Sequence, residues 1–353
     1  MDMKERHNDR QHCLQSFGLL ILIALFLCVG CSGCVSPTSI ANEILEAPNK
    51  HIRIPNEFQQ LGMAVSTNFP VKQVAVGPPP ATLDLMVMEP GDYHVQMSST
   101  FTLHPPQGPR EQRRYDFHLN YGLADFSRAP KPERAHGAIF LLPGYGLDKE
   151  AMMPWGFVLA NAGYQVILVD LRGNGHSTGD QIFFGGIERT DMVQCLDTLL
   201  KERVCSGPVG ALGVSYGAAL ALQWAAIDPR VQSVAVISPY LNTYIAVDRY
   251  LKTFTPDLTW KTDRKVATDV ANRLSIFEDL DTETAVRRIR HPILFIRTEH
   301  DEVCFREDLS RLQAAAVAGS KVKEIPLANH LLIGFCISQL GDTVAEWFRS
   351  QLQ

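Results

Sequence analysis

Residues 208–226 read PVGALGVSYGAALALQWAA, in which a short apolar run meets a helix-forming run at the motif G-V-S-Y-G. The run that ends at Val214 has the length and composition of a buried strand. The run that begins at Tyr216 consists mainly of alanines and leucines, which favour a helix. Ser215 therefore stands on a sharp strand-to-helix turn, where its hydroxyl projects above a sheet, and it is our candidate nucleophile. The glycines that relieve crowding in this turn are Gly213 and Gly217.

A second G-x-S-x-G motif surrounds Ser177. Ser177 lies seven residues after Asp170, where the preceding apolar run ends, and no helix-forming run begins behind it. A nucleophilic serine needs the sharp turn between strand and helix, and Ser177 lacks it. We therefore expect Ser177 to be a loop residue.

Around the first motif, apolar runs that predict strands alternate with runs that predict helices. The predicted strands are 138–142, 164–169, 208–214, 231–237, 293–296 and 321–325, and the predicted helices are 149–162, 187–201, 216–226 and 342–352. Such alternation is typical of an α/β protein with a mostly parallel sheet and helices on both faces. Residues 240–290 interrupt it without a strand signal, and helices are predicted at 243–254 and 265–280. An insertion at the carboxyl edge of a parallel sheet is placed to roof a binding cleft.

The part of the chain before residue 136 has weaker signals. Residues 31–80 lack sustained periodicity and end in G-P-P-P, which excludes a helix interior or a central strand. We therefore expect a tether there, with local structure packed on the main domain as an alternative. The main domain is then 81–353. Alternating polar and apolar residues predict strands at 93–97, 99–103 and 115–119. His94, His104 and His118 lie there without metal-ligand spacing and are expected to be surface or core residues.

The composition limits the classes of function. The 353 residues are 46 % hydrophobic and 20 % charged, with a formal charge of −5, which is typical of a globular protein. Mild acidity argues against nucleic acid as a partner, because phosphate binding needs clustered Lys and Arg. The chain has no H-E-x-x-H motif and no paired C-x-x-C outside the N-terminal segment, so neither a metal nor another cofactor is expected.

The N-terminal segment has the pattern of an export signal. Residues 17–29 form an apolar run that is shorter than the ~20 residues of a membrane span but long enough for a signal peptide. The cysteines that follow small residues after this run resemble a bacterial lipoprotein signal. The resemblance implies a signal peptide at 1–30, acylation of Cys31, with Cys34 as the rival, and attachment to a bacterial membrane. An uncleaved anchor and a plain secretory signal remain alternatives.

From about residue 136 to 350 the chain resembles the α/β-hydrolase fold family, in its lipase-like and serine-aminopeptidase-like branch. The resemblance rests on the turn at Ser215, on D-L-R-G-N-G-H-S at 170–177, and on Asp301 and His330. It implies a mostly parallel sheet, a helical cap at 240–290 and antiparallel strands ahead of the parallel set, which we assign to the 93–119 region.

The resemblance also implies a catalytic triad in the order Ser215, Asp301, His330. A serine hydroxyl needs an imidazole within hydrogen-bond reach, and the imidazole needs a carboxylate that fixes its tautomer. All three residues follow the ends of predicted strands, although Glu299 and Glu302 remain rival acids. The tetrahedral intermediate needs two backbone N–H donors. By resemblance these belong to Tyr216 and to Tyr145, in the turn after the first parallel strand.

The sequence thus predicts a serine hydrolase, like a carboxylesterase or lipase, that cleaves small-molecule or lipid-like acyl esters at a membrane surface through an acyl-enzyme. A serine peptidase or amidase for small peptides is the runner-up, because the same triad serves both. A surface binding protein without turnover is the third possibility. Export also permits disulfides, so we weigh a bridge between Cys304 and Cys336, or between Cys195 and Cys205, against buried free thiols.

Overall fold

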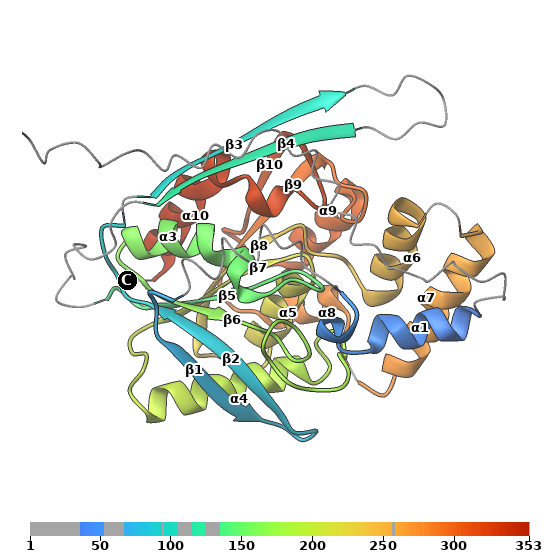
Figure 1. Ribbon diagram of the computed structural model, residues 1–353, viewed down its shortest axis with the longest axis horizontal. Helices are drawn as coiled ribbons and strands as arrows, with labels where there is room; N and C mark the ends of the chain where they lie inside the picture. Colours follow the sequence, from blue (N-terminus) through green and yellow to red (C-terminus); the bar gives the residue numbers. More distant parts are fainter. Residues whose placement is uncertain are drawn as a thin grey trace, which may run out of the picture.

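The centre of the structure is an eight-stranded sheet with the strand order β1-β2-β6-β5-β7-β8-β9-β10 (Figure 1). Within this order, the strands β6-β5-β7-β8-β9-β10 are parallel to one another, whereas β2 is antiparallel to both of its neighbours, β1 and β6. This computed structural model describes residues 36–52, 67–93, 95–104, 114–123, 135–255, 258–277 and 279–352. The strands of the sheet are β1 (Val71–Val76), β2 (Ala81–Met88), β5 (Ala138–Leu142), β6 (Gln165–Val169), β7 (Val209–Val214), β8 (Val231–Ile237), β9 (Ile293–His300) and β10 (Lys321–Asn329).

Helices cover both faces of this sheet. One face carries α3 (Met153–Asn161) and α10 (Ile337–Gln351), and the other carries α4 (Glu188–Lys201), α5 (Tyr216–Ala225), α8 (Thr282–Arg288) and α9 (Arg306–Ala315). Successive residues of a strand alternate between the two layers: Phe140 packs on the α5 side and Leu141 on the α3 side. All residues of β5, β6 and β7 are buried, as parallel strands covered on both faces require. The predicted fold class is confirmed.

A cap of two helices, α6 (Thr243–Phe254) and α7 (Trp260–Leu274), follows β8 (Figure 1). The sequence predicted the second helix at 265–280, but the hydroxyl of Thr259 accepts a hydrogen bond from Thr262 N and starts α7 earlier. The rest of the predicted cap, α8, packs against α5 and α9 in the layer beside the sheet. Within the described ranges, no helix is both long enough and apolar enough to cross a bilayer.

The antiparallel strands ahead of the parallel set are β1 and β2, so their assignment to the 93–119 region was wrong. β2 escaped detection because seven of its eight residues are buried, and the alternation of its two faces is hidden. The predicted strands of that region form a separate two-stranded sheet, β3 (Val95–His104) and β4 (Arg114–Leu123). This hairpin lies beside α10 and β10 (Figure 1).

The described part of the expected tether at 31–80 holds three elements, one of them the 3₁₀ turn Pro48–Lys50. β1 is an edge strand of the sheet, and α1 (Pro37–Leu45) packs against α7. The helix starts at the N-cap Ser36, whose hydroxyl accepts from Ser39 N, and proline is favourable in its first turn. Its buried face consists of only four residues, too few to give the sequence a recognisable helical periodicity: Ile40, Ala41, Ile44 and Leu45.

The predicted helix 149–162 is divided into a 3₁₀ turn, Lys149–Met152, and α3. Pro154 lies in the first turn of α3, where its missing N–H does no harm. Pro154 has no N–H for the carbonyl of Glu150, and that carbonyl instead accepts from Met153 N in the last hydrogen bond of the 3₁₀ turn.

A buried ion pair joins the loop after β6 to α4. The Arg172 guanidinium donates Nε to Asp191 Oδ2 at 2.7 Å and Nη2 to Asp191 Oδ1 at 2.8 Å, and both side chains are about 2 % exposed. Arg172 Nη2 also donates to Pro79 O at 2.8 Å. One guanidinium therefore holds the β1–β2 connection, the loop and α4 together.

We predict that Arg172→Met lowers the free energy of unfolding by about 3–5 kcal/mol, because it leaves the Asp191 carboxylate buried without its partner. Arg287, which pairs with Glu283 on the exposed face of α8, is the matched control. Arg287→Met is expected to cost less than about 1 kcal/mol. Urea unfolding of both variants measures the difference, and equal losses would contradict the prediction.

Candidate active site

The strand-to-helix turn at Ser215 is as sharp as the sequence implies. Ser215 has φ 51° and ψ −108°, a left-handed conformation that non-glycine residues seldom adopt, and its N–H donates to Ile237 O at 2.8 Å. A Cβ on Gly213 would lie 2.1 Å from Gly217 O, and a Cβ on Gly217 would lie 2.1 Å from Leu142 O. Only glycine fits at either position, so α5 can begin directly at the end of β7.

Ser215, His330 and Asp301 form one hydrogen-bonded line. Ser215 Oγ is 2.8 Å from His330 Nε2, and His330 Nδ1 is 2.8 Å from Asp301 Oδ1. The ionised carboxylate can only accept, so His330 Nδ1 carries the proton and Nε2 is free to accept from the serine hydroxyl. Asp301 directly follows β9 and His330 directly follows β10, and the two side chains are 5 % and 4 % exposed.

The Asp301 carboxylate has four donors. Oδ1 accepts from His330 Nδ1, from Val303 N at 3.0 Å and from Cys304 N at 2.7 Å, and Oδ2 accepts from Ser238 Oγ at 2.6 Å. The sequence reasoning missed Ser238. Its position directly after β8, beside the strand that carries the acid, was the available signal.

The two rival acids do not contact the imidazole ring in this way. Glu302 Oε2 accepts from the backbone N–H of His330 at 3.1 Å, whereas Glu299 is exposed. Glu302 therefore positions the loop that carries His330, and the ring itself is paired with Asp301.

Burial and charge oppose each other in this line. Burial alone would raise the pKa of Asp301, but the charge and hydrogen bond of His330, together with Ser238 and Cys304 N–H, hold that pKa below its usual range. Burial alone would lower the pKa of His330, but the charge and hydrogen bond of Asp301 raise it overall. Asp301 therefore stays ionised, and it stabilises a protonated imidazole when one forms.

The turn after β5 lies against Ser215. A Cβ on Gly144 would be 3.9 Å from Ser215 Cβ, and Tyr145 follows Gly144 at the tip of the turn. On the other side of the serine, Tyr216 is the first residue of α5, so its N–H belongs to the helix end where backbone donors lack intrahelical partners. Both predicted donor residues are thus next to the serine.

A cavity of about 100 Å³ opens beside the serine, between the turn after β5 and the cap. Apart from Ser215 and His330, the residues that line it are aliphatic, aromatic or glycine. Tyr145 stacks on Phe184 with ring centroids 6.2 Å apart, and the edge of Tyr216 meets both rings. None of the described residues that line this cavity is Asp, Glu, Lys or Arg.

Among the described side chains of residues 240–290, two aromatic residues line this cavity. Tyr240 and Tyr250 line it, together with aliphatic residues of α6. Tyr244 and Phe277 pack against the hydrophobic core instead. The side chains of Phe254 and Trp260 lie outside the described part of the structure.

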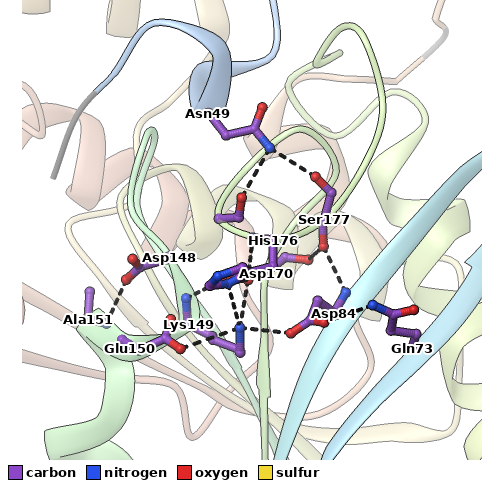
Figure 2. A network of polar contacts seen from close by, with 11 residues as sticks. Asn49, Gln73, Asp84, Asp148, Lys149, Glu150, Ala151, Asp170, His176 and Ser177 are labelled. Atoms are coloured by element: carbon purple, nitrogen blue, oxygen red, sulfur yellow. Dashed lines mark hydrogen bonds and ion pairs between the residues drawn. The ribbon is translucent and has the colours of Figure 1, made fainter. Parts of the chain in front are cut away.

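The second serine is a structural residue. Ser177 is 2 % exposed; its Oγ donates to Asp170 O at 2.6 Å and accepts from Asp84 N at 2.8 Å (Figure 2). It therefore joins the loop after β6 to β2, and it does not line the cavity beside Ser215. Nearby, the side chain of Asn49 donates to the carbonyls of Gly175 and Ser177.

Figure 2 also shows the buried ammonium of Lys149 among acidic groups. Lys149 Nζ is 2.8 Å from Asp84 Oδ1, 2.8 Å from Asp170 Oδ2 and 3.3 Å from His176 Nδ1. Ligand atoms of these three partners lie within 4.8 Å of one another, a spacing that suits a metal ion. The ammonium group of Lys149 already supplies the cation at this point, so the cluster does not indicate a metal site.

The loop after β6 also holds the turn after β5 in place. Lys149 N donates to Asp170 Oδ1 at 2.6 Å, and Gly146 N donates to Asn174 Oδ1 at 3.1 Å. Asn174 is 2 % exposed and in turn donates to Arg172 O. The backbone on the carboxyl side of Tyr145 is therefore held by buried side chains of the loop after β6.

The cysteines form no disulfide among the described residues, so the bridge that we considered is wrong. Cys304 and Cys336 are buried free thiols, and so are Cys195 and Cys205. Burial raises the pKa of Cys336 to about 12 and of Cys205 to about 11, which keeps both thiols protonated. The signal segment and Cys31 lie outside the described residues, as does His94.

Comparison with known proteins gives a family match. Residues 86–318 match the family described as X-Pro dipeptidyl-peptidase (S15 family). The matched range includes Ser215 and Asp301 and ends before His330. A curated relative, 2,6-dihydropseudooxynicotine hydrolase of Paenarthrobacter nicotinovorans, is 29 % identical over 180 residues. Half of this chain is aligned, and it spans about half the length (48 %) of that relative.

Solved structures with a similar fold include an esterase and a hydrolase. Esterase Pf2001 of Pyrococcus furiosus superposes with a TM-score of 0.58 and 16 % identity, over 85 % of this chain and 95 % of its own. A 2,6-dihydroxy-pseudo-oxynicotine hydrolase superposes with a TM-score of 0.52 and 17 % identity, over 84 % of this chain and 72 % of its own. These likenesses establish the α/β-hydrolase fold.

The pKa of Asp148 generates a prediction about stability. Burial, followed by the charges of Glu150 and Asp170, raises this pKa to about 7. An unfolded aspartate ionises near pH 4. Between these values the unfolded chain gains a charge that the folded state resists, so Asp148 destabilises the protein increasingly as pH rises from about 4 to 7.

Asp148→Asn is therefore expected to raise the free energy of unfolding more at pH 8 than at pH 5. Asparagine can still accept from Ala151 N, as Asp148 does, so the cap of the 3₁₀ turn is kept. Urea unfolding at both pH values measures this. Asp180→Asn is the control: Lys50 lowers the pKa of Asp180, so this carboxylate is ionised at both pH values and its replacement is expected to lower the free energy of unfolding equally at both. An equal gain for Asp148→Asn at both pH values would contradict the assignment.

Proposed function

The chain belongs to the X-Pro dipeptidyl-peptidase (S15) family of hydrolases, and from this premise we propose that it is a serine hydrolase of uncharged acyl esters. The observation that carries the proposal is the line Ser215–His330–Asp301, which ends in an apolar cavity. Ser215 is the nucleophile, His330 the general base and then the general acid, and Asp301 the residue that orients the imidazole.

In the first half of the reaction, Ser215 Oγ attacks the ester carbonyl carbon while His330 Nε2 takes the hydroxyl proton. The imidazolium that forms is stabilised by Asp301, which already accepts from Nδ1. His330 Nε2 then gives this proton to the leaving alcohol, and the acyl group remains on Ser215. Water repeats the sequence in the second half and releases the acid.

The negative charge of each tetrahedral intermediate is stabilised by two backbone N–H groups, from Tyr145 and Tyr216. The oxyanion lies over Ser215, between the turn after β5 and the first turn of α5. Preorganised donors of this kind are worth about 10²–10³ in rate each. The hydrogen bonds from Gly146 N and Lys149 N to the loop after β6 keep the turn in one conformation.

The cavity favours an ester over a dipeptide with a free amino terminus. An α-ammonium group moved out of water needs a carboxylate partner, and no acidic residue is among the described residues of the lining. An uncharged acyl group instead buries its surface on Tyr145, Phe184 and Tyr240. The family name keeps a peptidase activity as the second candidate, and a binding protein without turnover as the third.

We also propose that the protein is exported and acylated on Cys31, with Cys34 as the alternative. The apolar run 17–29 and the small residue before Cys31 support this proposal. A diacylated cysteine would hold the enzyme at a membrane surface, because each buried methylene contributes about 0.8 kcal/mol. The substrates would then include lipid-like esters.

Ser215→Ala is expected to lower kcat by about 10⁶-fold without unfolding the protein, and Asp301→Asn by about 10⁴-fold through the wrong imidazole tautomer. Rates are measured on p-nitrophenyl esters of increasing acyl length, beside aminoacyl- and dipeptidyl-p-nitroanilides. Turnover of the esters and not of the anilides is the expected outcome for the wild type.

Ser177→Ala is the matched control, because it removes the hydroxyl of the other G-x-S-x-G motif. It is expected to lower stability and to leave labelling of Ser215 by a fluorophosphonate intact. If Ser177→Ala abolishes labelling and Ser215→Ala does not, the nucleophile is misassigned. An unlabelled wild type would favour the binding protein, and preferred cleavage of the anilides would favour the peptidase.

Mass spectrometry of the mature N-terminus tests the anchor. Expression of the full chain in a bacterial host is expected to yield a first residue Cys31 that carries acyl chains. Cys31→Ser should abolish that modification, whereas Cys34→Ser should keep it. An unmodified first residue would overturn the proposed acylation. Acylation that is kept in Cys31→Ser and lost in Cys34→Ser would move the site to Cys34.

A further inference from the structure

The N-terminal segment that the sequence presented as a tether crosses the active-site side of the molecule. We call residues 36–52 the strap. Its second half is fixed to the loop after β6 by three backbone hydrogen bonds: Ile182 N to Leu45 O at 2.9 Å, Ala47 N to Asp180 O at 3.0 Å and Asn49 N to Gly173 O at 3.0 Å. The ion pair Lys50–Asp180 and the side chain of Asn49 add to these bonds.

The first half of the strap, α1, packs against the cap. The buried stripe of α1 joins the same hydrophobic core as Val266 and Val270 of α7. The guanidinium of Arg273 in α7 also donates to Asn42 of α1. The strap therefore bridges the cap and the body of the hydrolase, and Figure 1 shows α1 beside α7.

The strap also contacts the turn that carries Tyr145. The hydroxyl of Tyr145 donates to Ile44 O at 3.1 Å. On the carboxyl side of that tyrosine, a Cβ on Gly146 would lie only 2.5 Å from Ile52 Cδ1. The strap thus contacts the turn after β5 at two residues, Ile44 and Ile52.

Ile44 lines the cavity beside Ser215. It is the last but one residue of α1, and it faces the same space as Tyr145 and Leu251 of α6. Ile40, one helical turn earlier, is 1 % exposed and does not line the cavity. Among the described residues of the strap, Ile44 is therefore the one that lines this cavity.

We infer that the strap is a specificity element and that Ile44 sets the size of the acyl group that the cavity accepts. This inference rests on the proposed ester hydrolase. The cavity of about 100 Å³ is of the order of the ~150 Å³ apolar cavities that take up benzene. The substrate class is therefore an ester whose acyl group is ring-sized or a short chain.

The test uses the full chain with Ile44→Ala, Ile44→Val and Ile44→Phe, and p-nitrophenyl esters from acetate to decanoate. Ile44→Ala is expected to raise the ratio of kcat/KM for octanoate over butyrate by at least tenfold. This expectation follows because each further methylene group that the enlarged cavity buries contributes ~0.8 kcal/mol, which raises kcat/KM for the longer ester about fourfold. Ile44→Val should change the ratio in the same direction by less, and Ile44→Phe in the opposite direction.

Ile40→Ala is the matched control, because it removes the same atoms from the same helix. It is expected to lower the melting temperature as Ile44→Ala does and to leave the ratio within about twofold of the wild type. Since the readout is a ratio of two substrates on one enzyme sample, partial unfolding does not change it. Ile44→Val, which loses a single methyl group, gives the same readout if the alanine variant does not fold.

An unchanged ratio in all Ile44 variants, or an equal change in Ile40→Ala, would overturn the inference and leave the proposed ester hydrolase intact. A wild type that neither turns over the esters nor reacts with a fluorophosphonate would overturn the proposed function, and the inference with it. The two failures are therefore distinguishable in one set of experiments.

Discussion

The close approach of α5 to the ends of β5 and β7 is the constraint on which the rest of the site depends. Gly213 and Gly217 leave no space for a Cβ, so the helix starts within one residue of the strand. This contact forces Ser215 into a left-handed conformation and lifts its hydroxyl to the level of the loops after β9 and β10. A larger residue at either glycine would move the helix away, and the serine with it.

The loops around the serine are held by buried polar groups rather than by regular structure. On one side, the four donors to Asp301 fix the acid, and Glu302 fixes the backbone of the base. On the other side, Lys149 and Asn174 tie the turn after β5 to the loop after β6. Unsatisfied partners in such places are costly, so each group resists displacement. The rigidity comes from hydrogen bonds that join residues far apart in the sequence.

This division explains what could be predicted from the sequence. The turn at Ser215 is a local signal, because a buried strand and a helix meet within a few residues, and the same reasoning separated it from Ser177. The ends of strands also locate Asp301 and His330. Ser238 also follows the end of a strand, but its contact with Asp301 depends on β8 lying beside β9. Asn174 and Ile44 have no local signature, since their roles depend on which loops the sheet brings together. β2 was missed because burial on both faces removes the alternation that marks a strand.

The strap has a geometric consequence for an enzyme anchored through Cys31. Ser36, where the strap begins, is five residues after that cysteine, and five extended residues span at most about 18 Å. Ile44 in the wall of the cavity beside Ser215 and the acylated Cys31 would then lie on one short stretch of chain. The catalytic serine would stay close to the bilayer, and it would encounter esters with short acyl groups that partition into the leaflet as a two-dimensional pool. Catalysis would depend on the surface density of those esters more than on their concentration in solution.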